Sequence, residues 1–186
     1  MVVRHNRPDV VETMAKCSAV PVINAMTSES HPCEILSDLY AISKMREDYL
    51  ALQYTFVGPC GNIGKTWLEA ARALGLRFRQ CGPKGKGYDM PGVEVVHELD
   101  AAMQGSDVVL TDSLPREALD DFRPYQITLN AMRRANGNAM LNPCPPFCRG
   151  EEVSAEVIGS PFFVGYGFKA ALLSVQQALI VYLLGR

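Results

Sequence analysis

A glycine-rich turn in the middle of the chain constrains the fold more than any other feature. It spans residues 58–64, holds three glycines, and follows the apolar, strand-prone run 54–57. Glycine lets the backbone bend tightly and come close to a ligand. The turn opens a predicted helix over 65–74, closed by Gly75, and the first N–H groups of a helix attract anions. The pattern predicts a strand–turn–helix unit, either with a ligand at the turn or as a structural element alone.

The turn does not match the two common nucleotide-binding patterns. A P-loop has four residues between its glycines before Lys-Thr, whereas five residues separate Gly58 from Gly64 here. The spacing is also not the G-x-G-x-x-G of a dinucleotide-binding turn. We therefore do not expect nucleotide hydrolysis.

Apolar strand runs alternate with helical patterns along most of the chain. Strands are predicted at 2–3, 21–24, 54–57, 76–81, 93–96, 107–111, 139–142 and 162–164, and helices at 9–16 (capped by Asp9), 31–45, 65–74, 98–103, 125–135, 153–158 and 170–184. This alternation predicts an α/β fold with a doubly wound, mostly parallel sheet. Ligands of such sheets bind beyond the carboxyl ends of the strands. The glycine turn, Asp112 and the Cys144 loop all follow predicted strands.

Composition and charge exclude several classes of function. The formal net charge of −2 gives no reason to expect binding to nucleic acid or to a membrane surface. No apolar run is as long as a membrane span, and the first residues lack the apolar core of a signal peptide. Six scattered cysteines without an export signal are typical of reduced thiols in the cytoplasm.

Several candidate positions have a structural interpretation beside the functional one. His31 begins a helix and could cap it or pair with Glu34, and Asp112 could cap the segment after its strand. Cys144 could be a buried thiol, and 149–152 a solvated helix start with acids at the positive end of the dipole. The two cysteines of this loop, four residues apart, have no histidine nearby, so no metal site is expected.

Six motifs occur in order along nearly the whole chain. They are Pro-Val-Ile-Asn-Ala-Met-Thr at 21–27, His-Pro-Cys-Glu-Ile-Leu-Ser-Asp-Leu at 31–39, Val-Gly, Asn and Trp-Leu-Glu-Ala-Ala within 57–71, Asp-Val-Val-Leu-Thr-Asp at 107–112, Phe-Arg-Pro-Tyr-Gln-Ile-Thr at 122–128, and Cys-Pro-Pro-Phe-Cys-Arg-Gly-Glu-Glu-Val at 144–153. A closing Gln-Gln-Ala-Leu follows at 176–179. This order resembles the ornithine/aspartate carbamoyltransferase family, most closely its ornithine branch.

The resemblance implies a transfer from carbamoyl phosphate to the amino group of an amino acid. It assigns catalytic roles to Arg4, which contacts carbamoyl phosphate, to His31, which polarises the carbamoyl oxygen, and to Cys144, which matches a cysteine in the family's His-Cys-Leu-Pro loop. Asn62 and Asp112 match amino-acid-binding positions. A hydrogen-bonding cradle for the oxyanion suits this chemistry. Neither a metal nor an organic cofactor is implied.

The sequence also departs from the family pattern. The phosphate-gripping Ser-x-Arg-Thr loop does not occur in the 186 residues, and Ser-Leu-Pro-Arg at 113–116 replaces the family's Ser-Met-Gly loop. Glu34 stands at a glutamine position, where a carboxylate would repel phosphate or bind an amine. Pro143 and Pro145 flank the cysteine, and Leu172 replaces an arginine. We keep Glu34 and Arg149, from the Arg-Gly-Glu-Glu motif, as further substrate-binding candidates.

We therefore expect a truncated carbamoyltransferase. Residues 1–50 would be the end of a carbamoyl-phosphate domain, 51–169 an amino-acid-binding α/β domain, and 170–186 a closing helix. A homotrimer, or a second chain carrying the Ser-x-Arg-Thr loop, would complete the enzyme. The alternatives are a repurposed enzyme that does not use carbamoyl phosphate and a non-catalytic assembly subunit.

Overall fold

The computed structural model describes residues 1–88 and 93–185, which divide into two compact units. Unit 1 comprises Met1–Tyr49, Gly61–Trp67 and the chain from Tyr166 on. Unit 2 comprises Leu50–Cys60 and Leu68–Gly165.

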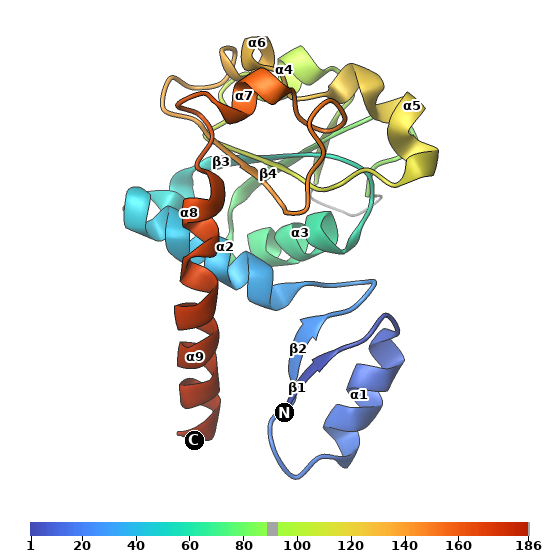
Figure 1. The fold of residues 1–186 in the computed structure, drawn as a ribbon, viewed down its shortest axis with the longest axis vertical. Helices are drawn as coiled ribbons and strands as arrows, with labels where there is room; N and C mark the ends of the chain where they lie inside the picture. The colour runs from blue at the N-terminus through green and yellow to red at the C-terminus, as the bar shows by residue number, and fades with distance from the viewer. Residues whose placement is uncertain (89–92, 186) are drawn as a thin grey trace. The chain divides into compact units, whose positions relative to one another are not determined.

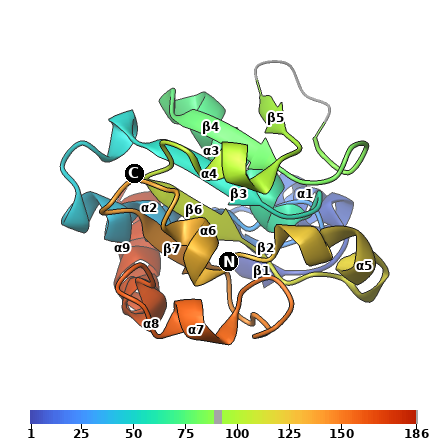
Figure 2. The same ribbon diagram turned by 90° about the horizontal axis from the view of Figure 1, so that it is seen from above.

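Unit 2 is built on a five-stranded parallel sheet. Its strands are β3 (Gln53–Val57), β4 (Arg77–Cys81), β5 (Glu94–Val96), β6 (Val108–Thr111) and β7 (Met140–Pro143). They lie in the order β5-β4-β3-β6-β7, and each neighbouring pair is parallel (Figure 2). The strand that enters the glycine turn, β3, is therefore central. The central strands are almost entirely buried, as expected of parallel strands covered on both faces.

Helices cover both faces of this sheet. The short helices α4 (Leu99–Met103) and α6 (Leu129–Met132) lie on one face, and α3 (Asn62–Leu74) lies on the other (Figure 1). A buried apolar cluster fills the space between the strands and α4, α6 and α7 (Ala155–Ile158), with Val109, Leu141, Met103, Met132 and Val157 among its members. The remaining short elements are η1 (Tyr49–Ala51), η2 (Arg116–Ala118), α5 (Leu119–Phe122) and η3 (Arg123–Tyr125). This arrangement confirms the predicted doubly wound α/β fold.

Unit 1 contains a small parallel sheet of two strands and several helices. The strands β1 (Val2–Arg4) and β2 (Ile23–Met26) pair in parallel, and α1 (Pro8–Cys17) connects them (Figure 1). After β2 comes α2 (Pro32–Met45), and the chain ends in α8 (Gly165–Lys169) and α9 (Ala171–Leu184). Helix α2 packs against both β2 and α9.

Several predicted boundaries are wrong for local reasons. Helix α3 begins at Asn62, three residues before the predicted start, because the first turn of the helix includes Gly64. The predicted helix 125–135 breaks into η3 and α6, because Thr128 caps a new helix by accepting from the Ala131 N–H. Segment 162–164 forms only an isolated bridge between Phe163 and Leu141. The N-cap of α1 is Arg7, which forms an ion pair with the expected cap, Asp9.

Helix α9 exposes most of its apolar surface. None of its described residues is buried, and Leu173, Ile180 and Leu184 are 69%, 38% and 69% exposed. By length and composition alone, the stretch Tyr166–Leu184 is apolar enough to cross a membrane, although the sequence analysis expected no such run. Only 6% of that stretch is buried, and a single helix of this kind is weak evidence for a span.

Candidate active site

His31 lies at the start of α2 and its side chain is partly buried. Its backbone N–H donates to Thr66 Oγ1 at 2.8 Å, and the Thr66 hydroxyl donates to the Asn62 carbonyl oxygen at 2.7 Å. His31 occupies the N-cap position of α2, as the structural interpretation expected, but its side chain makes no cap hydrogen bond to the described part of the helix. His31 Nδ1 is buried without a hydrogen-bond partner among residues 1–88 and 93–185. Such an atom is costly to bury, so a bound ligand is an expected partner.

Charges on three elements influence the pKa of His31. Burial lowers the pKa of His31 below its ordinary value, the negative charge of Glu34 opposes this shift, and the positive charges of Arg4 and Lys169 add to it. Arg4, at the end of β1, is exposed and forms no ion pair with any carboxylate of the described residues. The predicted residues Arg4 and His31 are therefore close enough to interact electrostatically. A free guanidinium, a neutral imidazole and a helix N-terminus form a favourable place for an anion.

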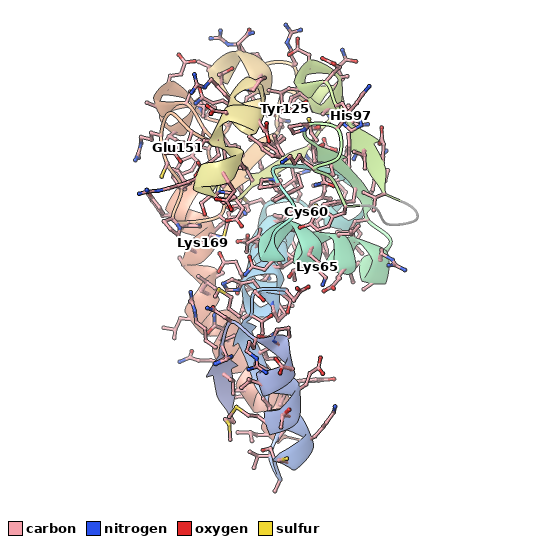
Figure 3. All side chains as sticks on the ribbon, turned by 90° about the vertical axis from the view of Figure 1, so that its right-hand side faces the viewer. Cys60, Lys65, His97, Tyr125, Glu151 and Lys169 are labelled. Atoms are coloured by element: carbon pink, nitrogen blue, oxygen red, sulfur yellow. The ribbon has the colours of Figure 1, made fainter. Side chains whose placement is uncertain are left out.

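Glu34 forms an ion pair with a lysine side chain of the same chain. Its Oε1 lies 2.5 Å from the Nζ of Lys169, which is labelled in Figure 3, and Asp38 Oδ1 lies 2.7 Å from the same nitrogen. All three side chains are at least 87% buried. Burial alone would lower the pKa of Lys169, but Asp38 and Glu34 outweigh it and hold that pKa above its ordinary value. The structure therefore pairs Glu34 with Lys169, and not with His31 as the sequence suggested.

Asn62 begins α3 and holds the loop that precedes His31. Its Nδ2 donates to the Thr27 carbonyl oxygen at 2.8 Å. Lys65, one turn further along α3, forms an ion pair with Glu29 in the same loop. This pairing agrees with the expectation that the Gly-Lys-Thr sequence is not a nucleotide-binding P-loop. Gly58 serves packing here, because a Cβ at this position would lie 3.1 Å from the Phe56 ring.

In unit 2, Asp112 and Cys144 follow neighbouring strands. Asp112 comes directly after β6 and Cys144 directly after β7, and the Cys144 N–H donates to the Thr111 carbonyl oxygen at 2.9 Å. Asp112 Oδ1 accepts from the Ser113 N–H at 2.9 Å. Cys144 is 7% exposed and is followed by the cis Pro145–Pro146 bond. The carboxyl edge of the sheet therefore brings these two predicted residues together, as parallel strands require.

The loop after Cys144 differs from the predicted helix start. Arg149 forms an isolated bridge with Val153, residues 150–152 form turns, and α7 begins only at Ala155, capped by Ser154. Arg149 is exposed and lies over the Phe147 ring. Glu152 is buried, with Oε1 accepting from the Cys148 N–H at 2.6 Å. Burial raises the pKa of Glu152 above its ordinary value.

One group of side chains in this loop has metal-ligating atoms. Ligand atoms of Cys148, Glu151 and Glu152 lie within 4.8 Å of one another. The Cys148 thiol is exposed, and the carboxylate of Glu151 raises its pKa above the ordinary value, which favours the protonated form. A structural zinc site needs a deprotonated thiolate in a closed tetrahedral shell. The group is therefore a poor zinc site.

Two residues that contact the predicted ones, Lys169 and Thr66, were not among the predicted candidates. Lys169 had a visible signal, because it is the only charged residue between Glu156 and Arg186. An isolated charge in an apolar stretch indicates a buried ion pair. Thr66 had no such signal, because its role depends on the approach of a segment 35 residues away.

Replacing Thr66 by valine tests how His31 is held. The change removes an acceptor from the His31 N–H in a buried place, so we expect a loss of about 1–3 kcal/mol in the free energy of unfolding. Thr13→Val is the matched control, because the Thr13 hydroxyl also donates to a carbonyl four residues back but is exposed. It should change stability by less than about 0.5 kcal/mol. Denaturant titration measures both, and equal losses would contradict the assigned role.

The fold defines a protein of two α/β units. Comparison with known proteins gives the family. Residues 51–183 match the aspartate/ornithine carbamoyltransferase Asp/Orn binding domain, and residues 1–44 match the carbamoyl-P binding domain of the same family. The chain belongs to the aspartate/ornithine carbamoyltransferase family, a family of transferases. Most of α9 lies inside the matched range, so this apolar helix is part of the family's fold.

Individual relatives are ornithine carbamoyltransferases. That of Chromobacterium violaceum is 34% identical over 200 residues, which cover 99% of this chain and 65% of the relative. The crystal structure of the Burkholderia thailandensis enzyme has a TM-score of 0.91 at 32% identity. The match covers 98% of this chain and 64% of the Burkholderia thailandensis chain. The Pyrococcus furiosus enzyme has a TM-score of 0.93 at 27% identity, over 99% of this chain. The chain thus spans just under two thirds of the length of such relatives.

Proposed function

We propose that this chain transfers a carbamoyl group from carbamoyl phosphate to an amino group of an ornithine-like amino acid, together with a second chain. The observation that carries the proposal is the buried Nδ1 of His31 at the start of α2, which has no hydrogen-bond partner among the described residues, together with the charge of Arg4 on β1, which acts on His31. These groups suit a ligand that has both a carbonyl oxygen and a phosphate. Membership in the carbamoyltransferase family supports the same reaction.

The chemistry assigned to unit 1 is electrostatic. The amine attacks the carbonyl carbon, the carbonyl oxygen takes up negative charge, phosphate leaves, and the amine loses a proton. A hydrogen bond from the imidazole of His31 stabilises that oxygen, and Arg4 with the first N–H groups of α2 stabilises the phosphate. No step requires a metal or an organic cofactor. We assign carbamoyl-phosphate binding to 1–50, amino-acid binding to 51–169, and a closing role to 170–186.

The amino acid would be bound by groups from the matched Asp/Orn binding domain, residues 51–183. The Asp112 carboxylate suits an α-ammonium group, and the exposed guanidinium of Arg149 suits an α-carboxylate. Asn62 supplies an amide for either group, although its Nδ2 already donates to Thr27. Cys144, buried at the same sheet edge as Asp112, would shape the pocket floor.

The second chain would supply the Ser-x-Arg-Thr loop that the 186 residues do not contain. The exposed apolar face of α9 is a surface that such a partner would cover. A homotrimer is the other assembly that the family resemblance implies. We place the assembly in the cytoplasm, in line with six free thiols.

An activity assay with and without a partner tests the proposal. The purified chain is mixed with carbamoyl phosphate and ornithine, alone and together with a co-expressed chain that carries a Ser-x-Arg-Thr loop. We expect carbamoylated product only in the mixture. Turnover of another amino acid without carbamoyl phosphate would favour the repurposed enzyme. Absence of any product, with Arg4→Ala and His31→Ala leaving partner binding intact, would favour an assembly subunit.

A further inference from the structure

Two buried carboxylates on α2, those of Glu34 and Asp38, contact the buried ammonium of Lys169. Glu34 and Asp38 are four residues apart on α2 and therefore lie on the same helix face, where both contact the single ammonium of Lys169. Glu34 is in the first turn of α2, and Asp38 is one turn further from His31. Of the two carboxylates, Glu34 is the one whose charge acts on His31.

An uncompensated carboxylate at this position would oppose anion binding. Charges of the same sign a few ångströms apart, and shielded from water, repel one another strongly. Glu34 is only 8% exposed, so solvent screens its charge poorly. The phosphate donor of the proposed function is an anion, and its binding groups Arg4 and His31 share this neighbourhood with Glu34.

We propose that Lys169 is a positioning residue that neutralises Glu34 and so keeps the Arg4–His31 region open to an anionic phosphate donor. The part of this inference that concerns an anionic donor rests on the proposed function. The electrostatic coupling of Lys169 and Glu34 to His31 does not. Lys169 acts through Glu34 and need not touch the substrate. The charged groups that act on His31 are Glu34 on α2, Arg4 on β1 and Lys169 on α8. Thr66, on α3, contacts the His31 backbone and carries no charge.

The first test follows the titration of His31 by NMR in the full chain. The chain has only three histidines, so His5 and His97 serve as internal references. Glu34→Gln removes a negative charge and leaves the Lys169–Asp38 pair in place, so the pKa of His31 should fall. Lys169→Met removes a positive charge, so that pKa should rise, and the double variant should return it toward the starting value. Asp38→Asn, one turn further away, should shift it less than Glu34→Gln.

The second test measures the affinity for carbamoyl phosphate by calorimetry, with the completing chain present. Lys169→Met should weaken binding about tenfold or more, and adding Glu34→Gln should restore most of the loss. Glu34→Gln alone should bind as tightly as the unchanged chain, or more tightly. Rescue by Asp38→Asn as complete as that by Glu34→Gln would overturn the proposal, because Lys169 would then serve only to balance buried charge.

The two tests separate failure of this inference from failure of the proposed function. If the unchanged chain binds no carbamoyl phosphate, the proposed donor is wrong, yet the NMR titration still decides whether Lys169 and Glu34 control His31. An unshifted His31 pKa in Glu34→Gln would overturn the inference. This variant keeps the Lys169–Asp38 ion pair, so it decides the question even if Lys169→Met does not fold.

Discussion

Replacing His31 by alanine should reduce carbamoyl transfer by about a hundred- to a thousandfold, the loss typical of removing one oxyanion-stabilising donor. The substitution takes away the imidazole whose Nδ1 is buried without a partner among the described residues. The backbone N–H that holds His31 to Thr66 remains, so the start of α2 should keep its conformation. Product formation by the completed enzyme measures the effect, and circular dichroism checks the fold.

His5→Ala is the matched control for this prediction. His5 is in the same unit and exposed, and its Nδ1 accepts only a local N–H from Arg7. Its replacement should leave activity within about twofold of the unchanged chain. Full activity of His31→Ala would exclude His31 from the mechanism.

The pH dependence of stability gives an independent check on His31. Its folded-state pKa is lowered from 6.5, so the unfolded chain binds more protons as the pH falls below that value. The contribution of His31 to stability is therefore present above pH 6.5 and is lost as the pH falls toward the folded-state pKa. His31→Ala should flatten the stability curve in this range. An unchanged slope would mean that the imidazole is not buried in its neutral form.

Replacing Leu173 and Leu184 by lysine should abolish assembly with a partner or with further copies. Together with Ile180 these residues are spaced by seven and four, which places them on one stripe of α9. Burying a large aliphatic side chain is worth about 1.5–3 kcal/mol, so losing two of them should weaken association by at least two orders of magnitude. Light scattering measures the change in mass.

Leu74→Lys is the matched control for the α9 variant. Leu74 is also an exposed leucine at the end of a helix, 46% exposed, but it belongs to α3 and not to the apolar stripe of α9. The control should assemble normally, and both variants should keep the melting temperature of the unchanged chain within a few degrees. An unchanged chain that is monomeric even with the proposed partner would contradict the prediction.

The parallel sheet could be predicted from sequence because its strands are apolar on both faces. Runs such as 54–57 and 107–111 are continuous enough to mark β3 and β6 within a residue or two. Helices whose boundaries do not follow from the hydrophobic pattern were harder to predict. The segment after Tyr125 has helical composition, but the backbone extends at Gln126 and Thr128 restarts the helix, which no periodicity reveals.

The site was predictable as a set of residues but not as a set of contacts. Motif order pointed to Arg4, His31, Asp112 and Cys144, and parallel topology accounts for the adjacency of the last two. The charge state of the His31 region was not predictable. Glu34 was expected to act on a ligand, and its partner, Lys169, is 135 positions away in the chain.

The sequence by itself determined the α/β alternation, the order of the motifs and the family, because these depend on local hydrophobic pattern and residue identity. Only the tertiary structure decided that a His31 nitrogen has no hydrogen-bond partner among the described residues and that Lys169 forms ion pairs with both Glu34 and Asp38. The physical reason is that such contacts join segments far apart in the chain. Their energies depend on distance and burial, which arise only when the units fold.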